Sequence, residues 1–220
     1  MKHSIKVVGE AKVSAAPDRV RIIINIGNIS KEYHEAMSTA EKSEAEMADT
    51  IEKAGFLKTD LKTLSWNITT EYEYVINEKN EQVKVFAGYR YKHSFEVELG
   101  IDHQAIGRIL QGLIQSSLTP EISLEYFVSE LQEYKDKLLH QAVEDSRHKA
   151  AIMAEAGDAR LGSVISMKYK NGYQNMARGM DNHVAVPMMA KGTFRLPDIT
   201  PVDIELSEHV LVVWELQLQL

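Results

Sequence analysis

The chain of 220 residues contains no cysteine. This absence excludes disulfide bonds, thiol nucleophiles, cysteine-ligated zinc and iron–sulfur clusters. A chain of this length can bury about 70% of the surface that its unfolded form exposes, so it can fold without such crosslinks. Its stability must come from the packing of apolar side chains and from hydrogen bonds.

Long apolar runs and an excess of basic residues are also missing. No segment approaches the ~18 uninterrupted apolar residues of a membrane span, and no apolar stretch of signal-peptide length follows Lys2. We therefore expect a soluble, cytoplasmic protein without a membrane span; if a leader was removed, the periplasm or cell envelope is expected instead. The net charge of −7 argues against nucleic acid as a partner, because phosphate binding requires a basic surface.

The motifs of common enzyme classes are absent as well. The chain has no G-x-S-x-G, no phosphate-binding loop and no dinucleotide-binding fingerprint. Residues 157–162 begin and end with glycine, but they follow a predicted helix rather than a strand, so they are better explained as a helix end. We expect no catalytic residue, no metal site and no cofactor, and a non-enzymatic role more than an enzymatic one.

Alternation of apolar and polar residues, which is typical of half-buried strands, recurs along most of the chain. It predicts strands at 5–13 and 20–26 joined as a hairpin, a long hairpin at 64–76 and 83–99, and strands at 122–128, 164–169 and 210–218. Pro17 and Asp18 form the turn of the first hairpin. Gly88 marks a bend or bulge in the second, because glycine inside a strand often does so.

Apolar residues at three- and four-residue spacing predict three amphipathic helices. The first starts at the N-cap Ser30 and ends at Ala54, the second follows the N-cap Asp102, and the third follows a capping box at Ser129. The element order is therefore β-β-α-β-β-α-β-α-β-β. This order predicts the α+β class, with a largely antiparallel sheet and helices packed on one side, in a single domain over residues 1–220.

Several of these segments resemble the SIMPL-domain family, also called DUF541. The resemblance depends on the order and spacing of pieces that cover nearly the whole chain: 7–13, Pro17-Asp18, 64–74, Gly88-Tyr89, 142–162 and 201–216. It implies a mixed fold of sheet and helices, self-association, and a stress-related role in protein interaction. No catalytic residue carries over, because the family offers no established ones.

His93 is the first candidate for chemistry. It shares the parity of Tyr91 and Phe95, so it should point to the apolar side of its strand, where burial shifts a histidine pKa. Two interpretations remain open. His93 is either a core histidine paired with a neighbour, or it forms with Tyr91 a pocket for a small ligand or a hydrolytic reaction.

A histidine pair and a group of tyrosines are further candidates. His140, Glu144 and His148 share one stripe of the third helix, but this stripe lies opposite the apolar side, which favours a solvated surface over a zinc site. The tyrosines of the long hairpin share the parity of its apolar residues, which favours core or cross-strand pairs over base stacking: Tyr72, Tyr74, Tyr89 and Tyr91.

The periodicity fails between residues 170 and 201, a stretch that holds four of the nine methionines: Met176, Met180, Met188 and Met189. Methionine adapts to binding surfaces, and irregular segments of this length are usually functional or disordered. We expect this loop to contribute to an interface with another copy or with a protein partner. The predicted function is that of a self-associating, non-enzymatic interaction or scaffold protein; the alternative is a small-ligand-binding protein or hydrolase with a pocket near His93.

Overall fold

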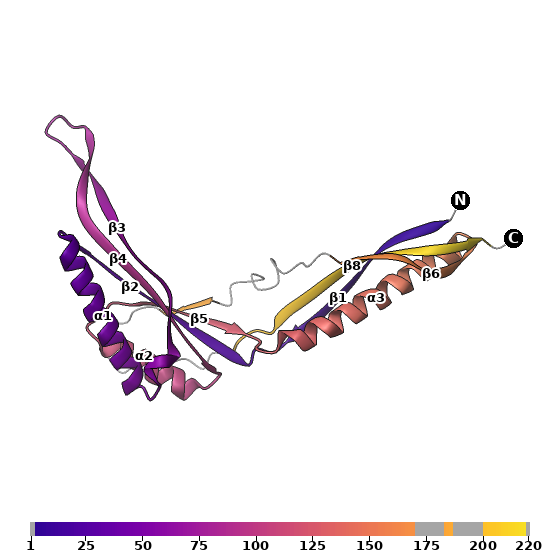
Figure 1. Cartoon of the computed structure of the whole chain (residues 1–220), viewed down its shortest axis with the longest axis horizontal. Coiled ribbons are helices and arrows are strands. Elements are labelled where there is room, and N and C mark those ends of the chain that lie inside the picture. Colours follow the sequence, from indigo (N-terminus) through magenta and orange to yellow (C-terminus); the bar gives the residue numbers. More distant parts are fainter. Residues whose placement is uncertain (1–2, 170–182, 187–199, 219–220) are drawn as a thin grey trace. The chain divides into compact units, whose positions relative to one another are not determined.

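The computed structural model describes residues 3–169, 183–186 and 200–218 (Figure 1). Within these ranges lie three α-helices, one short 3₁₀ helix and eight strands in two antiparallel sheets. The α+β class and the approximate element order are confirmed. The strands divide between two sheets where one was expected, and each sheet has helices against one of its faces.

The chain forms two compact units, each with its own sheet and core. Among the described residues, unit 1 contains 3–17, 128–169 and 201–218, and unit 2 contains 18–127, 183–186 and 200. Unit 2 is therefore inserted into the sequence of unit 1. The prediction of one SIMPL-like domain over residues 1–220 stays a prediction, because a family domain can include two compact units.

Unit 2 contains the five-stranded sheet, with strand order β3-β4-β2-β5-β7. Its strands are β2 (Arg19–Ser30), β3 (Leu61–Ile76), β4 (Gln82–Gly100), β5 (Glu121–Phe127) and β7 (His183–Val186). Its helices are α1 (Tyr33–Lys53), the short η1 (Lys58–Asp60) and α2 (His103–Gln115). The predicted N-cap of α2 is confirmed, because the Asp102 carboxylate accepts hydrogen bonds from the backbone N–H groups of Gln104 and Ala105.

The core of unit 2 lies between this sheet and the two helices. Alternate side chains of β2 and β4 are buried there, as the period of two predicts: Val20, Ile22, Ile24, Ile26, Tyr91, Phe95 and Val97. Helix α2 presents Ile106, Ile109, Leu110 and Leu113 to them. Since burying one such side chain stabilises by about 1.5–3 kcal/mol, this core is a principal source of the stability of unit 2.

Unit 1 contains the three-stranded sheet β1-β8-β6 and one long helix. These elements are β1 (Ser4–Ala15), α3 (Leu131–Ala156), β6 (Ala159–Tyr169) and β8 (Ile204–Leu218). Helix α3 approaches β1 so closely at Gly9 that an added Cβ would lie 1.9 Å from the carbonyl oxygen of Ala142. Only glycine fits between this strand and the helix.

Four local predictions are corrected. The first two strands do not form a hairpin, because β1 pairs with β8 whereas β2 pairs with β4 and β5. Ser30 is the last residue of β2, and α1 has Glu32 as its N-cap; α3 likewise has Glu130 as its N-cap in place of the expected Ser129. A short strand, β7, lies within the stretch expected to be irregular. Periodicity predicts which way side chains point, but it does not identify the pairing partner.

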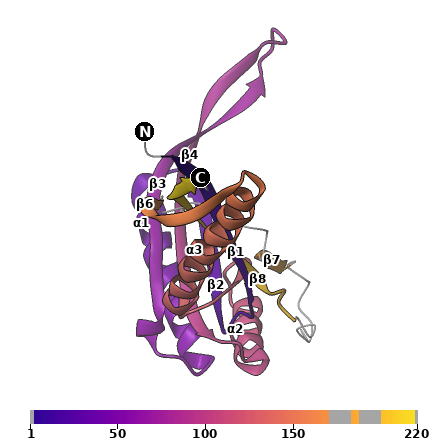
Figure 2. The same cartoon turned by 90° about the vertical axis from the view of Figure 1, so that its right-hand side faces the viewer.

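The predicted irregularity at Gly88 is confirmed. Gly88 has a φ of 146°, and the register of β3 with β4 shifts between Glu71 and Tyr72, where Ala87 is the extra residue. Strand β2 ends opposite this point, since Ser30 pairs with Tyr89. Beyond it, β3 and β4 pair only with each other among the strands that the structure describes, and this two-stranded part, residues 72–86, is called the arm here. Figure 2 shows the arm extending past the end of β2.

Gly88→Ala should lower the free energy of unfolding by about 1–3 kcal/mol, because alanine is strained at this φ and its Cβ would lie 2.5 Å from the carbonyl oxygen of Ser30. Gly107→Ala is the matched control in α2. No atom lies within 4 Å of its added Cβ, so the better helix former should raise the stability by up to about 1 kcal/mol. Urea unfolding followed by circular dichroism measures both, and effects of equal sign would contradict this account.

Candidate functional site

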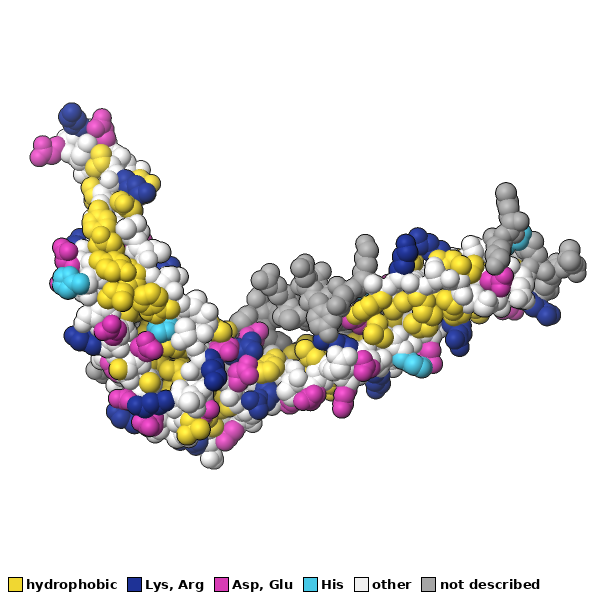
Figure 3. All heavy atoms as spheres, in the orientation of Figure 1, with side chains coloured by type: hydrophobic (Ala, Val, Ile, Leu, Met, Phe, Trp, Pro, Cys, Tyr) yellow, Lys and Arg dark blue, Asp and Glu magenta, His cyan; other side chains and the backbone are white. Residues whose placement is uncertain are grey.

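Exposed apolar side chains follow the β3–β4 hairpin on the face that also carries the core of unit 2. We call this set the hairpin surface: Leu64, Trp66, Tyr72, Tyr74, Ile76 and Phe86. Trp66 lies opposite the core residue His93, and Tyr72 lies opposite Phe86. Figure 3 shows the resulting band of hydrophobic side chains along the hairpin. Tyr74 is 63% exposed and Ile76 71%, so the end of the band toward the turn is the barest.

A chain of edge-to-face aromatic contacts includes two of these six side chains, Tyr72 and Phe86. Tyr33 at the start of α1 contacts Tyr89 with ring centroids 5.4 Å apart, Tyr89 contacts Phe86 at 5.2 Å, and Phe86 contacts Tyr72 at 5.9 Å. The Lys84 ammonium lies 4.4 Å from the centroid of the Tyr72 ring. Such pairs contribute about 0.5–1.5 kcal/mol each beyond area burial, so the rings are ordered before any partner arrives.

The chemistry of the hairpin surface fits a protein partner better than a nucleic acid. Large apolar patches are rare on monomeric proteins and mark interaction sites, and tyrosine and tryptophan are enriched there. Single-stranded nucleic acids also stack on aromatics, but their phosphates require a basic groove. The arm carries three glutamates and two lysines: Glu73, Glu78, Glu81, Lys79 and Lys84. This balance disfavours a polyanion.

His93 and Tyr91 lie in the core of unit 2. His93 is 3% exposed, its ring lies 3.7 Å from that of Phe95, and its Nε2 is 3.2 Å from Thr63 Oγ1. The Tyr91 hydroxyl is 2.9 Å from Ser43 Oγ on α1. Within the described residues Nδ1 of His93 has no hydrogen-bond partner, so we assign the proton to Nε2, which donates to Thr63. This packing matches the interpretation of a core histidine, and the two cavities described below are lined by other residues.

Burial lowers the pKa of His93, and the negative charge of Glu44 opposes this shift only in part. The unfolded chain, with a histidine pKa of about 6.5, therefore binds this proton more readily than the folded chain. The neutral core histidine therefore contributes fully to stability above pH 6.5, the pKa of the unfolded chain, and this contribution is lost as the pH falls through the lower pKa of the folded chain.

We expect the free energy of unfolding of His93→Gln to fall less than that of wild type between pH 7 and pH 5, because glutamine does not titrate. Urea unfolding at each pH measures the free energy of unfolding. If it changes with pH equally in wild type and in His93→Gln, His93 is not a neutral core histidine with a lowered pKa.

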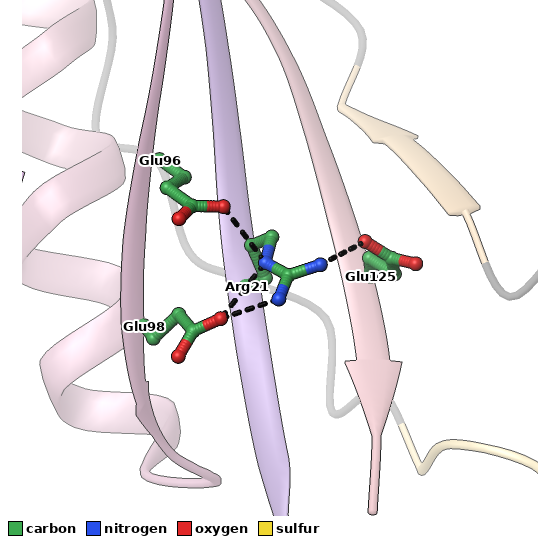
Figure 4. A network of polar contacts seen from close by, with 4 residues as sticks. All are labelled: Arg21, Glu96, Glu98 and Glu125. Carbon is green, nitrogen blue, oxygen red and sulfur yellow. Dashed lines mark hydrogen bonds and ion pairs between the residues drawn. The ribbon is translucent and has the colours of Figure 1, made fainter. Parts of the chain in front are cut away.

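A polar network crosses the opposite, solvent-facing side of the five-stranded sheet (Figure 4). Arg21 on β2 contacts Glu96 at 2.9 Å and Glu125 on β5 at 3.1 Å, and it also pairs with Glu98 on β4. Burial alone would lower the pKa of Arg21, but the hydrogen bond to Glu98 and the three negative charges raise it. Each carboxylate is held by the guanidinium, so the network connects three strands.

A polar cleft of about 710 Å³ lies between α1 and α2. Both Glu46 carboxylate oxygens accept hydrogen bonds from Ser117, which lowers the pKa of Glu46. Arg108, also in the lining, donates from Nε to the carbonyl oxygen of Ala54 and so closes the end of α1. These contacts explain the polar side chains as connections between the helices and the loop that follows α2.

The histidines of α3 lie on an exposed stripe. His140 Nδ1 is 3.6 Å from a Glu144 oxygen, and their side chains are 75% and 63% exposed. A shallow hollow beside them is lined by Leu139, Val143 and Arg147 as well. No group of three or more histidine or acidic side chains in the described ranges is placed to hold a metal ion.

Although α3 has 26 residues, neither it nor another described helix is long and apolar enough to cross a membrane.

The methionines of the predicted interface loop are not among the residues that the structure describes. Met176, Met180, Met188 and Met189 lie outside the described residues. In unit 1, a second apolar group lies on the side of the sheet opposite α3, where Val8 on β1 pairs with Leu211 on β8. Val8 is half-exposed and Leu211 partly so, and Val164, Ile165, Met167 and Tyr169 on β6 are exposed as well.

A family model described as SIMPL, "Protein of unknown function (DUF541)", matches residues 5–214. The chain belongs to the SIMPL family. The chain is 26% identical over 212 residues to "Uncharacterized protein YggE" of Escherichia coli (strain K12), covering 95% of this chain and 81% of the relative. A protein of the same title from Edwardsiella ictaluri (strain 93-146) is 25% identical over 161 residues, which is 73% of this chain and 65% of that protein. The match confirms the resemblance and covers parts of both units.

The exposure of the hairpin surface in this SIMPL-family chain was missed from sequence. Tyr72 does form the expected cross-strand pair, with Phe86, and Tyr91 is in the core, but Tyr74 is open to solvent. One signal was available. The alternating segments of the long hairpin are much longer than those of the neighbouring strand, so part of the hairpin had to extend beyond it.

Proposed function

We propose that this protein is a non-enzymatic, self-associating protein with an interaction or scaffold role, and that its copies meet through the hairpin surface. The single observation that carries the proposal is the row of exposed aromatic and aliphatic side chains from Trp66 to Ile76, in which Tyr72 is held by its contact with Phe86. The family resemblance supports self-association and adds a stress-related role to the proposal. The buried, neutral His93 and the fully engaged carboxylates around Arg21 favour a role without catalysis.

The size of the hairpin surface is adequate for association. Covering one large apolar side chain completely is worth about 1.5–3 kcal/mol. Bringing two proteins together costs about 4–15 kcal/mol, so several such side chains must be covered at once. The hairpin surface offers six in one band, and their aromatic contacts reduce the ordering that binding requires.

Tyr74→Glu combined with Ile76→Glu should abolish self-association, because two charges would have to be buried in the interface. Both positions are exposed, so the fold should survive. Ser38→Glu combined with Ala45→Glu adds the same charge at exposed positions of α1 and is the matched control. Light scattering after size exclusion, over a concentration series, should give a multiple of 24.9 kDa for wild type and control, and 24.9 kDa for the arm variant.

A wild-type mass of 24.9 kDa at every concentration would contradict self-association. An arm variant that keeps the wild-type mass would leave self-association standing but remove the hairpin surface from it. Circular dichroism of each variant separates a lost interface from a lost fold.

We also propose that the methionine loop contributes to an interface. Replacing its four methionines by glutamine keeps the side-chain length and removes most of the apolar contact: Met176, Met180, Met188 and Met189. We expect the assembly to weaken roughly tenfold or more in dissociation constant, because each tenfold change requires only about 1.4 kcal/mol. Analytical ultracentrifugation measures the constant, and an unchanged value would remove the loop from the interface.

A further inference from the structure

Strand β3 is the outer strand of the five-stranded sheet, next to β4 alone. It is 16 residues long, and no other described strand pairs with its second side. One row of its backbone N–H and C=O groups is therefore available to another strand. The strand at the opposite edge of this sheet, β7, has only 4 residues. The long open edge thus lies at the β3 side.

Proteins usually protect such an edge with charges, proline, bulges or a short strand. β3 has an extra residue at Leu64, where its register with β4 shifts, and it carries Glu71 and Glu73 toward the arm. Between these features, residues 65–70 (SWNITT) contain no charge, no proline and no glycine, and their pairing with β4 is regular. Residues 65–70, the regular part of the edge, therefore lack the charges, prolines and bulges that usually prevent pairing with another strand.

We propose that β3 of a second copy occupies this edge, antiparallel to the first and related to it by a two-fold axis at Thr70. This inference rests on the proposed self-association and specifies how it occurs. The two five-stranded sheets then form one continuous sheet, and the two hairpin surfaces lie on the same face of it. Main-chain hydrogen bonds supply affinity, and side-chain pairs on that face determine the register.

The position of the axis follows from the regular part of β3. Beyond the bulge at Leu64, β3 is regular from Ser65 to its end at Ile76, because the second register shift comes from an extra residue in β4. An axis at Thr70 allows all of residues 65–75 to pair. Moving the axis to Thr69 limits the pairing to residues 65–73. Moving it to Glu71 places two like charges opposite each other, which is destabilising.

The axis at Thr70 also gives each apolar side chain an apolar partner. Trp66 of one copy lies opposite Tyr74 of the other, and Ile68 lies opposite Tyr72. Aromatic and β-branched pairs of this kind stabilise antiparallel sheets. On the other face, Asn67 lies opposite Glu73, so no like charges meet. At the centre two threonines face each other, which is itself a favourable cross-strand pair.

The absence of cysteine makes this arrangement directly testable by single substitutions. In Thr70→Cys the two thiols would be on opposed residues, whose Cβ atoms lie about 4.5–5.5 Å apart, close to disulfide distances of about 3.5–4.5 Å. Mild oxidation, or a short bismaleimide, should give a covalent dimer of the full-length protein. Lys79→Cys, in the turn of the hairpin, is the control for random collision, and we expect at least roughly tenfold less dimer from it at micromolar concentration.

A mixing experiment tests the register. Asn67→Cys and Glu73→Cys should each crosslink poorly alone, because like positions lie about 20 Å apart along the strands. Mixed and allowed to exchange subunits, they should crosslink with each other. Thr70→Lys, which opposes two ammonium groups at the axis, should shift the mass toward 24.9 kDa, whereas Thr70→Val should not.

The results separate this inference from the proposed function. Two results would overturn the inference if wild type is an oligomer. The Thr70→Cys variant could form no more crosslinked dimer than the Lys79→Cys variant, or its thiol could stay fully reactive to maleimide in the oligomer. In either case the edge of β3 is open or pairs with a strand of another protein. Self-association then stands without it. If wild type is a monomer at every concentration and no dimer forms, both fail. Efficient links in the Thr70→Cys variant and between the Asn67→Cys and Glu73→Cys variants confirm the arrangement.

Discussion

The arm exposes apolar surface because β4 is longer than β2, the strand beside it. β4 has 19 residues and β2 has 12, and β2 ends at Ser30, which pairs with Tyr89 next to Gly88. Up to that point the apolar face of β4 is covered by the helices, and beyond it the strand has β3 alone. The same alternation that buries Tyr91 therefore leaves Tyr72, Phe86 and Tyr74 bare. The core and the interaction surface are two parts of one sheet face, distinguished only by what covers them.

The two faces of this sheet are specialised differently. On the solvent side, Arg21 connects β4, β2 and β5 through three glutamates and neutralises one of their three negative charges. On the other side, aromatic rings contact one another from Tyr33 to Tyr72 and keep the bare part ordered. A surface of this kind suits association through shape and apolar contact, since its charges are few and of mixed sign.

Local chemistry in the sequence was sufficient to predict nearly every strand and helix, the N-cap Asp102 and the irregularity at Gly88, because each depends on neighbouring residues only. Pairing partners were not predictable in the same way. Val7 and Ile22 both alternate with polar neighbours, yet their strands belong to different sheets. Exposure was harder still to predict: Tyr74 and Tyr91 both lie in alternating segments, but Tyr91 is in the core and contacts Ser43 on α1, whereas Tyr74 is exposed. That distinction depends on a helix remote in sequence.

The pairing of β1 with β8 has a consequence for biosynthesis. Ala15 pairs with Ile204 and Ser4 with Glu215, so β1 leaves the ribosome long before β8, the strand with which it pairs. Strands β2 to β5 and both helices of unit 2 emerge in between and can begin to fold while β1 has no neighbour. At translation rates of about 5–20 residues per second this interval lasts on the order of ten seconds or more. During it, the apolar side of the nascent β1 is a natural substrate for chaperones, and a message truncated before β8 yields a chain whose first unit has no central strand.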